Sequence, residues 1–233
     1  MSGAELIVRL PGRGRVLFSA RGDGNMSSVG GDGAADGARS RERLRERIGV
    51  QRLVRGHQVH GSVVARLSSP PGEQAGGATA VACDGQATAL RGVGAMVLVA
   101  DCLPVALGRS GAVAIVHAGW RGLAAGVLEQ GVLAVAELGG QSAGGDGELV
   151  AIVGPGAGVC CYEVGEEVHE LFGAAHRRGT NIDLRAIAHE RLLAAGVSRV
   201  EHVRACTICD ERFFSHRREG ARAGRQAGVA WLS

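Results

Sequence analysis

The residues of this chain that are best suited to do chemistry are a cysteine and a histidine on two neighbouring apolar segments. Residues 94–107 and 112–117 are both rich in Val, Leu, Ile and Ala, and glycines stand at both ends of the short segment between them. Short apolar runs bounded by glycine turns are typical of buried strands. If residues 108–111 form a four-residue turn, Cys102 lies directly opposite His117, with Cβ atoms about 4.5 to 5.5 Å apart.

A paired cysteine and histidine indicate one of two chemistries. The histidine can accept the thiol proton, which makes the cysteine a nucleophile. Alternatively, both side chains bind a catalytic zinc that has three protein ligands and one open position. The third ligand would then come from His57 or His60, and an extended segment turns these two side chains to opposite faces. Taken singly, Cys102 and His117 are each also compatible with an ordinary buried position.

Two further residues are candidates for the same site. Asp101 adjoins Cys102 on the opposite strand face and can orient a histidine or a substrate; the alternative is a turn carboxylate. Arg121 lies in the segment HAGWRG (117–122), which leads into a predicted helix. A helix N-terminus beside an arginine is a suitable phosphate site, although a solvated arginine is equally compatible with this position.

The remaining motifs favour structural roles. The glycine-rich segment 154–158 is not a Walker motif, because no Gly-Lys-Ser/Thr follows it. We expect the adjoining Cys160 and Cys161 to be packed thiols. Cys206 and Cys209 have CxxC spacing, but the second CxxC of a structural zinc site is missing, which favours buried or loop thiols there.

The elements expected around these residues mix strands and helices without strict alternation. Two long loops are predicted, at 21–39 and 68–80. Ser40 and Gly49 bound the first of four predicted helices, and six strands are predicted in addition to the two apolar segments. The fold class expected is α+β, a single domain over residues 1–233 with mixed β-sheets flanked by helices. The predicted strands are 6–9, 15–19, 51–55, 149–153, 200–203 and 228–232, and the predicted helices are 40–48, 120–138, 164–175 and 183–195.

The composition argues against a nucleic-acid-binding protein and against a membrane protein. The 233 residues are 45% hydrophobic and carry a formal net charge of +3, which fits a site for a small anion better than a nucleic-acid surface. No segment has the roughly 18 to 20 apolar residues that span a bilayer, and residues 1–10 lack the apolar core of a signal peptide. We therefore expect a cytoplasmic protein that binds no membrane, with its six cysteines as thiols or metal ligands.

Five motifs in a fixed order resemble the YfiH/laccase-domain family, also called the polyphenol oxidase or peptidoglycan-editing-factor family. The resemblance extends from about residue 16 to the C-terminus. Arg21, in FSARGDG, matches an arginine of the family's N-terminal signature, and the segment that follows is shorter here. The motifs are HQVHG (57–61), ADCLPVAL (100–107), VHAGWRG (116–122), GPGAGVCCYEVGEEV (154–168) and FFSHRREGARAGRQAGVAWL (213–232).

This resemblance implies one zinc ion held by His60, Cys102 and His117. It also implies a purine nucleoside enzyme, with phosphorolysis of adenosine, inosine or methylthioadenosine and deamination of adenosine. On that basis we expect a purine nucleoside and phosphate as partners, in a monomer or weak homo-oligomer. The residues expected to act are Cys102, His60, His117 and Asp101 in catalysis and Arg21, Gln58 and Arg121 in substrate binding.

Three other functions are weighed against this one. Some family members are linked to editing of serine-containing cell-wall precursors, which the same site would hydrolyse. A multicopper oxidase needs many histidines, and this chain has eight and no His-x-His pair, although a His₂Cys site can take up copper in vitro. A zinc-stabilised binding module would normally need four protein ligands, and three are expected to converge here.

Overall fold

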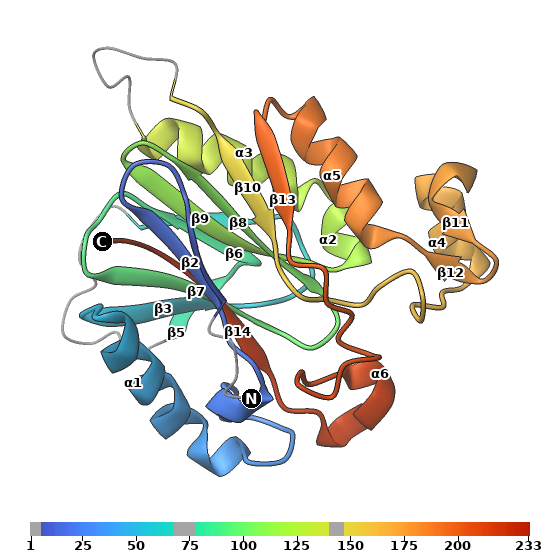
Figure 1. Ribbon diagram of the computed structural model, residues 1–233, viewed down its shortest axis with the longest axis horizontal. Coiled ribbons are helices and arrows are strands. Elements are labelled where there is room, and N and C mark those ends of the chain that lie inside the picture. The colour runs from blue at the N-terminus through green and yellow to red at the C-terminus, as the bar shows by residue number, and fades with distance from the viewer. Residues whose placement is uncertain (1–5, 68–77, 140–146) are drawn as a thin grey trace.

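Two six-stranded sheets packed face to face form the centre of the molecule (Figure 1). The structure, a computed structural model, describes residues 6–67, 78–139 and 147–233. In both sheets parallel and antiparallel neighbours occur together. The fold class predicted from the sequence, a single domain of mixed sheets flanked by helices, is therefore confirmed.

The first sheet joins the two ends of the chain. Its terminal strand β14 pairs with β2 on one side and with β7 on the other, so the last strand lies in the middle of the sheet. The order across the sheet is β1 (Leu6–Arg9), β2 (Gly14–Phe18), β14 (Gln226–Leu232), β7 (Val93–Val99), β3 (Arg52–His57) and β5 (Ala78–Ala82).

The second sheet carries the predicted hairpin at its centre. Strands β8 and β9 are antiparallel neighbours there, while β10 and β13 pair in parallel at one edge. The order is β13 (Arg199–His202), β10 (Val150–Val153), β8 (Leu103–Arg109), β9 (Ala112–Ala118), β6 (Gly85–Thr88) and β4 (Val64–Leu67). A two-stranded pair, β11 (Arg177–Arg178) and β12 (Asn181–Ile182), lies apart.

Helices cover the outer face of each sheet, so that the molecule is built as helix, sheet, sheet, helix (Figure 1). Leu44 of α1 packs with Met96 and Trp231 of the first sheet, and Leu128 of α3 packs with Val116 of the second. None of the described helices is long and apolar enough to cross a membrane. The helices are α1 (Gly37–Ile48), α2 (Trp120–Ala124), α3 (Val127–Leu138), α4 (Glu166–Phe172), α5 (Leu184–Ala194) and α6 (His216–Glu219).

The apolar segments are nearly continuous because both faces of these strands are buried. In β9, Val113 and Ile115 face the layer between the sheets, whereas Ala114 and Val116 face the helices on the outside. Both faces of this strand are thus buried, which requires apolar side chains at successive positions. His117 falls on the inner face at the end of this strand, where a polar side chain needs a specific partner.

Two expectations about the central segment are wrong in detail. The apolar run 94–107 is two strands in different sheets, because the chain leaves β7 at Val99 and enters β8 at Leu103. The hairpin has a two-residue turn rather than four, with Arg109 opposite Ala112 and Pro104 opposite His117. Cys102 therefore precedes β8 instead of facing His117 within the ladder. A shift of two residues keeps the same face, so the two side chains still converge.

Other elements match the prediction with shifted bounds. The single helix expected over 120–138 is divided, because Gly126 takes a left-handed conformation (φ 87°) between α2 and α3. The expected loop 21–39 contains two 3-10 turns and the start of α1. Of the expected loop 68–80, residues 68–77 lie outside the described residues and 78–80 belong to β5.

Candidate active site

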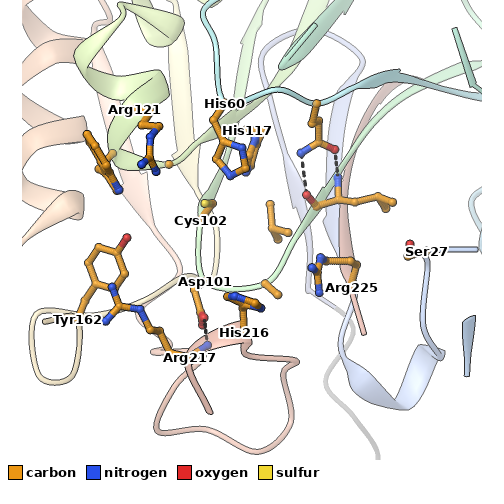
Figure 2. Close-up of a pocket in the computed structure, with 16 residues that line it drawn as sticks. Ser27, His60, Asp101, Cys102, His117, Arg121, Tyr162, His216, Arg217 and Arg225 are labelled. Carbon is orange, nitrogen blue, oxygen red and sulfur yellow. Dashed lines mark hydrogen bonds between the residues drawn. The ribbon is translucent and has the colours of Figure 1, made fainter. Parts of the chain in front are cut away.

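Three side chains that could bind a metal converge at the ends of the strands. His60 follows β3, Cys102 lies on the crossover from β7 to β8, and His117 is near the end of β9. Their nitrogen and sulfur atoms all lie within 4.8 Å of one another. The two imidazole rings meet edge to face with centroids 4.8 Å apart, and both are directed toward the thiol (Figure 2).

Asp84 holds both histidines in place, and the sequence reasoning missed it. Its carboxylate oxygen Oδ1 lies 2.8 Å from His117 Nδ1 and accepts the His60 backbone N–H at 2.9 Å. The other oxygen, Oδ2, accepts the backbone N–H groups of Val59 and Gly61. A carboxylate at Nδ1 fixes the proton there, so the neutral ring of His117 presents Nε2 to the site.

The backbone around the site is constrained as well. His60 and Asp101 have positive φ values, 60° and 87°, in a region that residues other than glycine rarely occupy. The three N–H bonds to Asp84 stabilise the turn at His60. Gly119 is required by packing, since a Cβ atom there would lie 2.7 Å from Cys102 Sγ.

The charged forms of Cys102 and His117, two of the three candidate ligand residues, stabilise each other. Burial favours the neutral thiol, yet the nearby His117 and His60 outweigh this and lower the pKa of Cys102 to about 6. Burial likewise disfavours an imidazolium, but the Cys102 thiolate and the Asp84 carboxylate raise the pKa of His117 to about 9. Both shifts favour a Cys102 thiolate paired with a His117 imidazolium.

The donor set fits a catalytic zinc ion. Two imidazoles and one thiolate are common zinc ligands, and three protein ligands leave a fourth position for a substrate. The buried Asp84 beyond His117 provides the hydrogen bond that metal-bound histidines usually have. His57, the other candidate ligand, ends β3 and is not part of this group of three.

A pocket of about 440 Å³ is lined by His60, Cys102 and His117. Its walls combine cationic groups with aromatic rings, and Figure 2 shows Arg121 and Tyr162 on one side of it and Arg225 on the other. Arg121 lies over the Trp120 ring, with 4.0 Å between the guanidinium carbon and the ring centroid. Arg217 lies similarly over Tyr162, at 4.9 Å.

Asp101 and Gln58 line the pocket, but their polar atoms are engaged elsewhere. The Asp101 carboxylate accepts the Thr207 hydroxyl at 2.7 Å and the Arg217 backbone N–H at 2.8 Å. The amide of Gln58 exchanges two hydrogen bonds with the backbone of Leu98, each 2.8 Å long. These contacts give both residues a role in shaping the pocket wall, and the histidine-orienting role expected of Asp101 belongs to Asp84.

Arg21 lies outside the residues that line the pocket. Its guanidinium donates to the carbonyl groups of Glu211 and Phe213, pairs with Glu219 at 2.5 Å and stacks on the Phe214 ring. Through these bonds Arg21 links the segment after β2 to the segment that precedes α6. This placement does not support the substrate-binding role expected of Arg21. Arg217 and Arg225, which the sequence reasoning did not single out, line the pocket instead.

The expectation of packed thiols at Cys160 and Cys161 is wrong for the exposed Cys160, whereas Cys209 is a loop thiol, as expected. Cys160 and Cys209 are exposed, and Cys161 and Cys206 are half-buried. All four sulfur atoms lie within 4.8 Å of one another, in a second group separate from the pocket.

Comparison with known proteins identifies the family. A family model described as multi-copper polyphenol oxidoreductase laccase matches residues 13–233. The chain belongs to this family. The family resemblance stated from the five motifs is thereby confirmed.

Relatives of this chain are named for an activity on nucleosides. A protein of Xylella fastidiosa named purine nucleoside phosphorylase is 38% identical over 95% of this chain and 88% of its own length. A Corynebacterium glutamicum protein with the same description is 34% identical over 94% of each chain. Among solved structures, a Neisseria meningitidis protein of family DUF152 superposes with a TM-score of 0.82 at 28% identity, covering 98% of this chain and 99% of that one.

Proposed function

We propose that this protein is a zinc-dependent purine nucleoside phosphorylase with His60, Cys102 and His117 as the zinc ligands. The observation that carries the proposal is the convergence of these three ligands at a pocket lined by arginines and aromatic rings. The names of the relatives support the reaction class. A volume of about 440 Å³ is within the usual range for small-molecule sites.

The arginines of the pocket are the proposed phosphate site. Within the part of the chain that the structure describes, the Arg121 guanidinium has no ion pair, and it rests on the Trp120 ring. Guanidinium groups suit phosphate because they offer parallel N–H donors in a planar fork. Arg217 and Arg225 add positive charge to the same pocket. We assign phosphate binding to these three residues.

The aromatic residues are the proposed nucleoside site. Trp120 and Tyr162 both line the pocket and offer ring faces or edges to a flat purine. Burial raises the pKa of Tyr162 to about 12, so the phenol keeps its proton at neutral pH. It can therefore donate a hydrogen bond to a ring nitrogen of the purine or to a ribose oxygen.

In the proposed reaction, a phosphate oxygen bonds to ribose C1′ while the bond from C1′ to purine N9 breaks. The electron pair of that bond leaves with the purine, which takes up the proton that the phosphate loses, and ribose 1-phosphate is the second product. The arginines hold the phosphate against the sugar, and the Tyr162 phenol stabilises charge that develops on the substrate. A zinc ion bound by the three ligand residues would act as a Lewis acid. Asp84 keeps His117 in the orientation that this requires.

The substrate range is tested by chromatography of the purified protein with adenosine, inosine and methylthioadenosine, each with and without phosphate. The proposal expects the free base and a sugar phosphate, formed only when phosphate is present. Inosine formed from adenosine without phosphate would add deamination to the activity. Turnover of serine-containing cell-wall precursors in place of all three nucleosides would overturn the proposal.

A further inference from the structure

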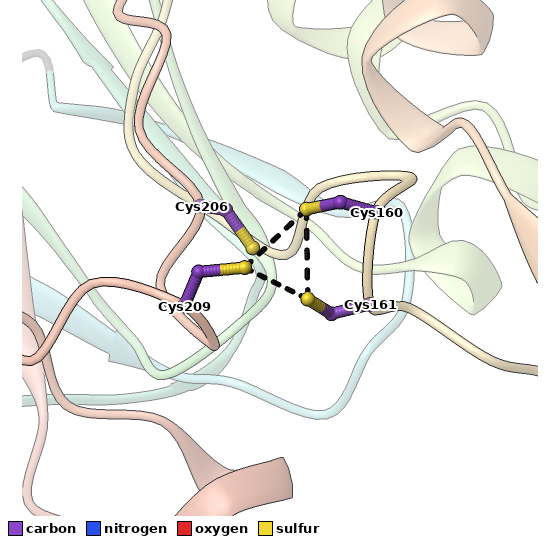
Figure 3. Close-up of side chains that lie close together, drawn as sticks. All are labelled: Cys160, Cys161, Cys206 and Cys209. Atoms are coloured by element: carbon purple, nitrogen blue, oxygen red, sulfur yellow. Dashed lines mark hydrogen bonds between the residues drawn. The ribbon is translucent and has the colours of Figure 1, made fainter.

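Four cysteines from two distant parts of the chain form a compact cluster on the side of the molecule where β10 and β13 end (Figure 3). Cys161 Sγ lies 2.8 Å from Cys209 Sγ, and Cys160 Sγ lies 3.4 Å from Cys209 Sγ and 3.5 Å from Cys161 Sγ. Cys206 completes the group, in which all four sulfur atoms are within 4.8 Å of one another.

The topology of the second sheet explains why these cysteines meet. Strands β10 and β13 pair in parallel, so the loops that follow them leave the sheet at the same end. Cys160 and Cys161 lie on the first loop, and Cys206 and Cys209 lie on the second. Gly156 of the first loop accepts the Thr207 backbone N–H at 3.1 Å, which aligns the two loops beside the cluster.

A backbone N–H group and an arginine near the cluster would stabilise negatively charged thiolates. The backbone N–H of Gly158 donates to Cys206 Sγ at 3.2 Å. The side chain of Arg185 donates to carbonyl groups of both loops, those of Gly154, Gly156, Val203 and Ala205. One guanidinium thus fixes both loops and places a positive charge near the sulfur atoms.

We infer that Cys160, Cys161, Cys206 and Cys209 bind a second zinc ion, in a closed structural site. Four thiolates around one ion are a standard structural zinc site, and Zn–S bonds of about 2.3 Å place tetrahedral sulfurs about 3.8 Å apart. Two of the observed separations, 3.4 and 3.5 Å, are close to that spacing, a third is 2.8 Å, and no pair exceeds 4.8 Å. In a disulfide each sulfur has one partner at about 2.05 Å, whereas Cys209 Sγ lies near two sulfurs, 2.8 Å from Cys161 Sγ and 3.4 Å from Cys160 Sγ.

This second site supports one wall of the pocket. Cys161 directly precedes Tyr162, which lines the pocket, and Cys206 directly precedes Thr207. The Thr207 hydroxyl in turn donates to Asp101, the neighbour of Cys102. The zinc ion therefore acts as a positioning element, fixing the two loops that carry Tyr162 and Thr207.

The test is the zinc content of full-length protein purified in zinc-containing buffer with a reducing agent, measured by inductively coupled plasma mass spectrometry. We expect about two zinc ions per chain in the wild type and about one in Cys102→Ala. In the Cys102→Ala background, the additional changes Cys206→Ser and Cys209→Ser should remove the remaining ion. Cys83→Ala, which removes a buried cysteine outside both groups, serves as the control and should keep both ions.

Two further readouts need no substitution within the four-cysteine cluster. Four thiols of folded Cys102→Ala should resist DTNB and become reactive after a strong chelator is added. The intact mass of denatured, unreduced protein should correspond to six thiols. A Cys102→Ala protein that holds no zinc, a mass lower by one pair of hydrogen atoms per disulfide, or iron with sulfide in place of zinc would each overturn the inference. The inference rests on the zinc that remains in Cys102→Ala, so neither a lack of nucleoside turnover nor a lack of zinc at His60, Cys102 and His117 would change that result.

Discussion

The Asp84 carboxylate and the His117 imidazole are 2.8 Å apart in the protein interior, with Asp84 fully buried. The same carboxylate accepts three backbone N–H groups from the turn that carries His60. One side chain thus positions two of the three candidate zinc ligands from behind the pocket wall, since it is not among the residues that line the pocket. Hydrogen bonds of this kind keep the pKa of Asp84 below its usual value although burial raises it, so the group stays ionised.

Replacing Asp84 with asparagine should weaken zinc binding at this site. The amide keeps one oxygen acceptor, but its NH₂ group faces N–H donors and no negative charge remains for His117. We expect the dissociation constant for zinc to rise about 10- to 100-fold. Competition with a chromophoric chelator measures it in a background that lacks Cys206 and Cys209. An unchanged dissociation constant in a folded Asp84→Asn protein would show that the carboxylate does not support the ligand.

Arg121 is the strongest test of the phosphate site. Loss of a charged hydrogen bond costs about 1.5 to 3 kcal/mol, which corresponds to about a 10-fold or greater rise in KM for phosphate in Arg121→Ala. The KM for the nucleoside should change much less. Arg39→Ala, which removes an exposed arginine paired with Asp36, is the matched control and should leave both values unchanged. If Arg121→Ala and Arg39→Ala changed the KM for phosphate equally, Arg121 would not be a phosphate ligand.

Much of the fold could be predicted because burial imposes a pattern on the sequence. The apolar runs of β7, β8 and β9 and the terminal strand β14 are evident from their composition, because both faces of these strands are covered. The strands that were missed are short: β4, β5 and β6 have four or five residues, with Arg, Thr, Gly or Gln interrupting the apolar ones, and β11 and β12 have two each. Sequence alone also did not show that β7 and β8 belong to different sheets, since a crossover of three residues resembles an interruption within one strand.

The candidate site was predictable only in part, for a similar reason. His60, Cys102 and His117 lie in distinctive motifs, whereas Asp84 stands in ACDGQ (82–86), a segment with no recognisable pattern. Its role depends on the pairing of β6 with β9, which is a long-range contact. The four-cysteine cluster depends on the parallel pairing of β10 with β13 in the same way. A cysteine pair after each of two adjacent strands was the signal that could have indicated it.

The break between α2 and α3 gives a test of the local backbone. Gly126 has φ 87°, and a Cβ atom added there would lie 3.5 Å from Glu129 Oε2, an ordinary van der Waals distance. Gly126→Ala should therefore destabilise the protein by about 1 to 2 kcal/mol through backbone conformation rather than through a clash. Urea unfolding measures the loss. Gly22→Ala, at a position with ordinary φ and open space, is the control and should cost far less.

The contact between His202 and His189 should make stability depend on pH. The two rings stack with centroids 5.2 Å apart, and His202 Nε2 lies 3.0 Å from His189 Nδ1. The pKa of His202 lies below its ordinary value of 6.5, mainly because the ring is buried. The nearby positive groups His189, Arg185 and Arg204 lower it further, and Asp183 only partly opposes them.

A histidine with a lowered pKa binds its proton more readily in the unfolded chain. Its contribution to stability is therefore complete above pH 6.5 and is lost as the pH falls through the folded-state pKa. We expect the wild type to lose more unfolding free energy than His202→Gln between about pH 7.5 and 5.5. The measurement is urea unfolding of both proteins at the two pH values with the same zinc content. Parallel losses in the two proteins would show that His202 makes no such contribution.

The most direct test of the central claim compares adenosine phosphorolysis by the wild type and by Cys102→Ala, both equilibrated with zinc and analysed for metal. The wild type should release adenine and ribose 1-phosphate only when phosphate is present. Cys102→Ala should lose this activity together with one zinc ion, while the ion at the four-cysteine cluster remains. Undiminished phosphorolysis by Cys102→Ala, or full zinc retention in it, would contradict the assignment of His60, Cys102 and His117 as the catalytic zinc site.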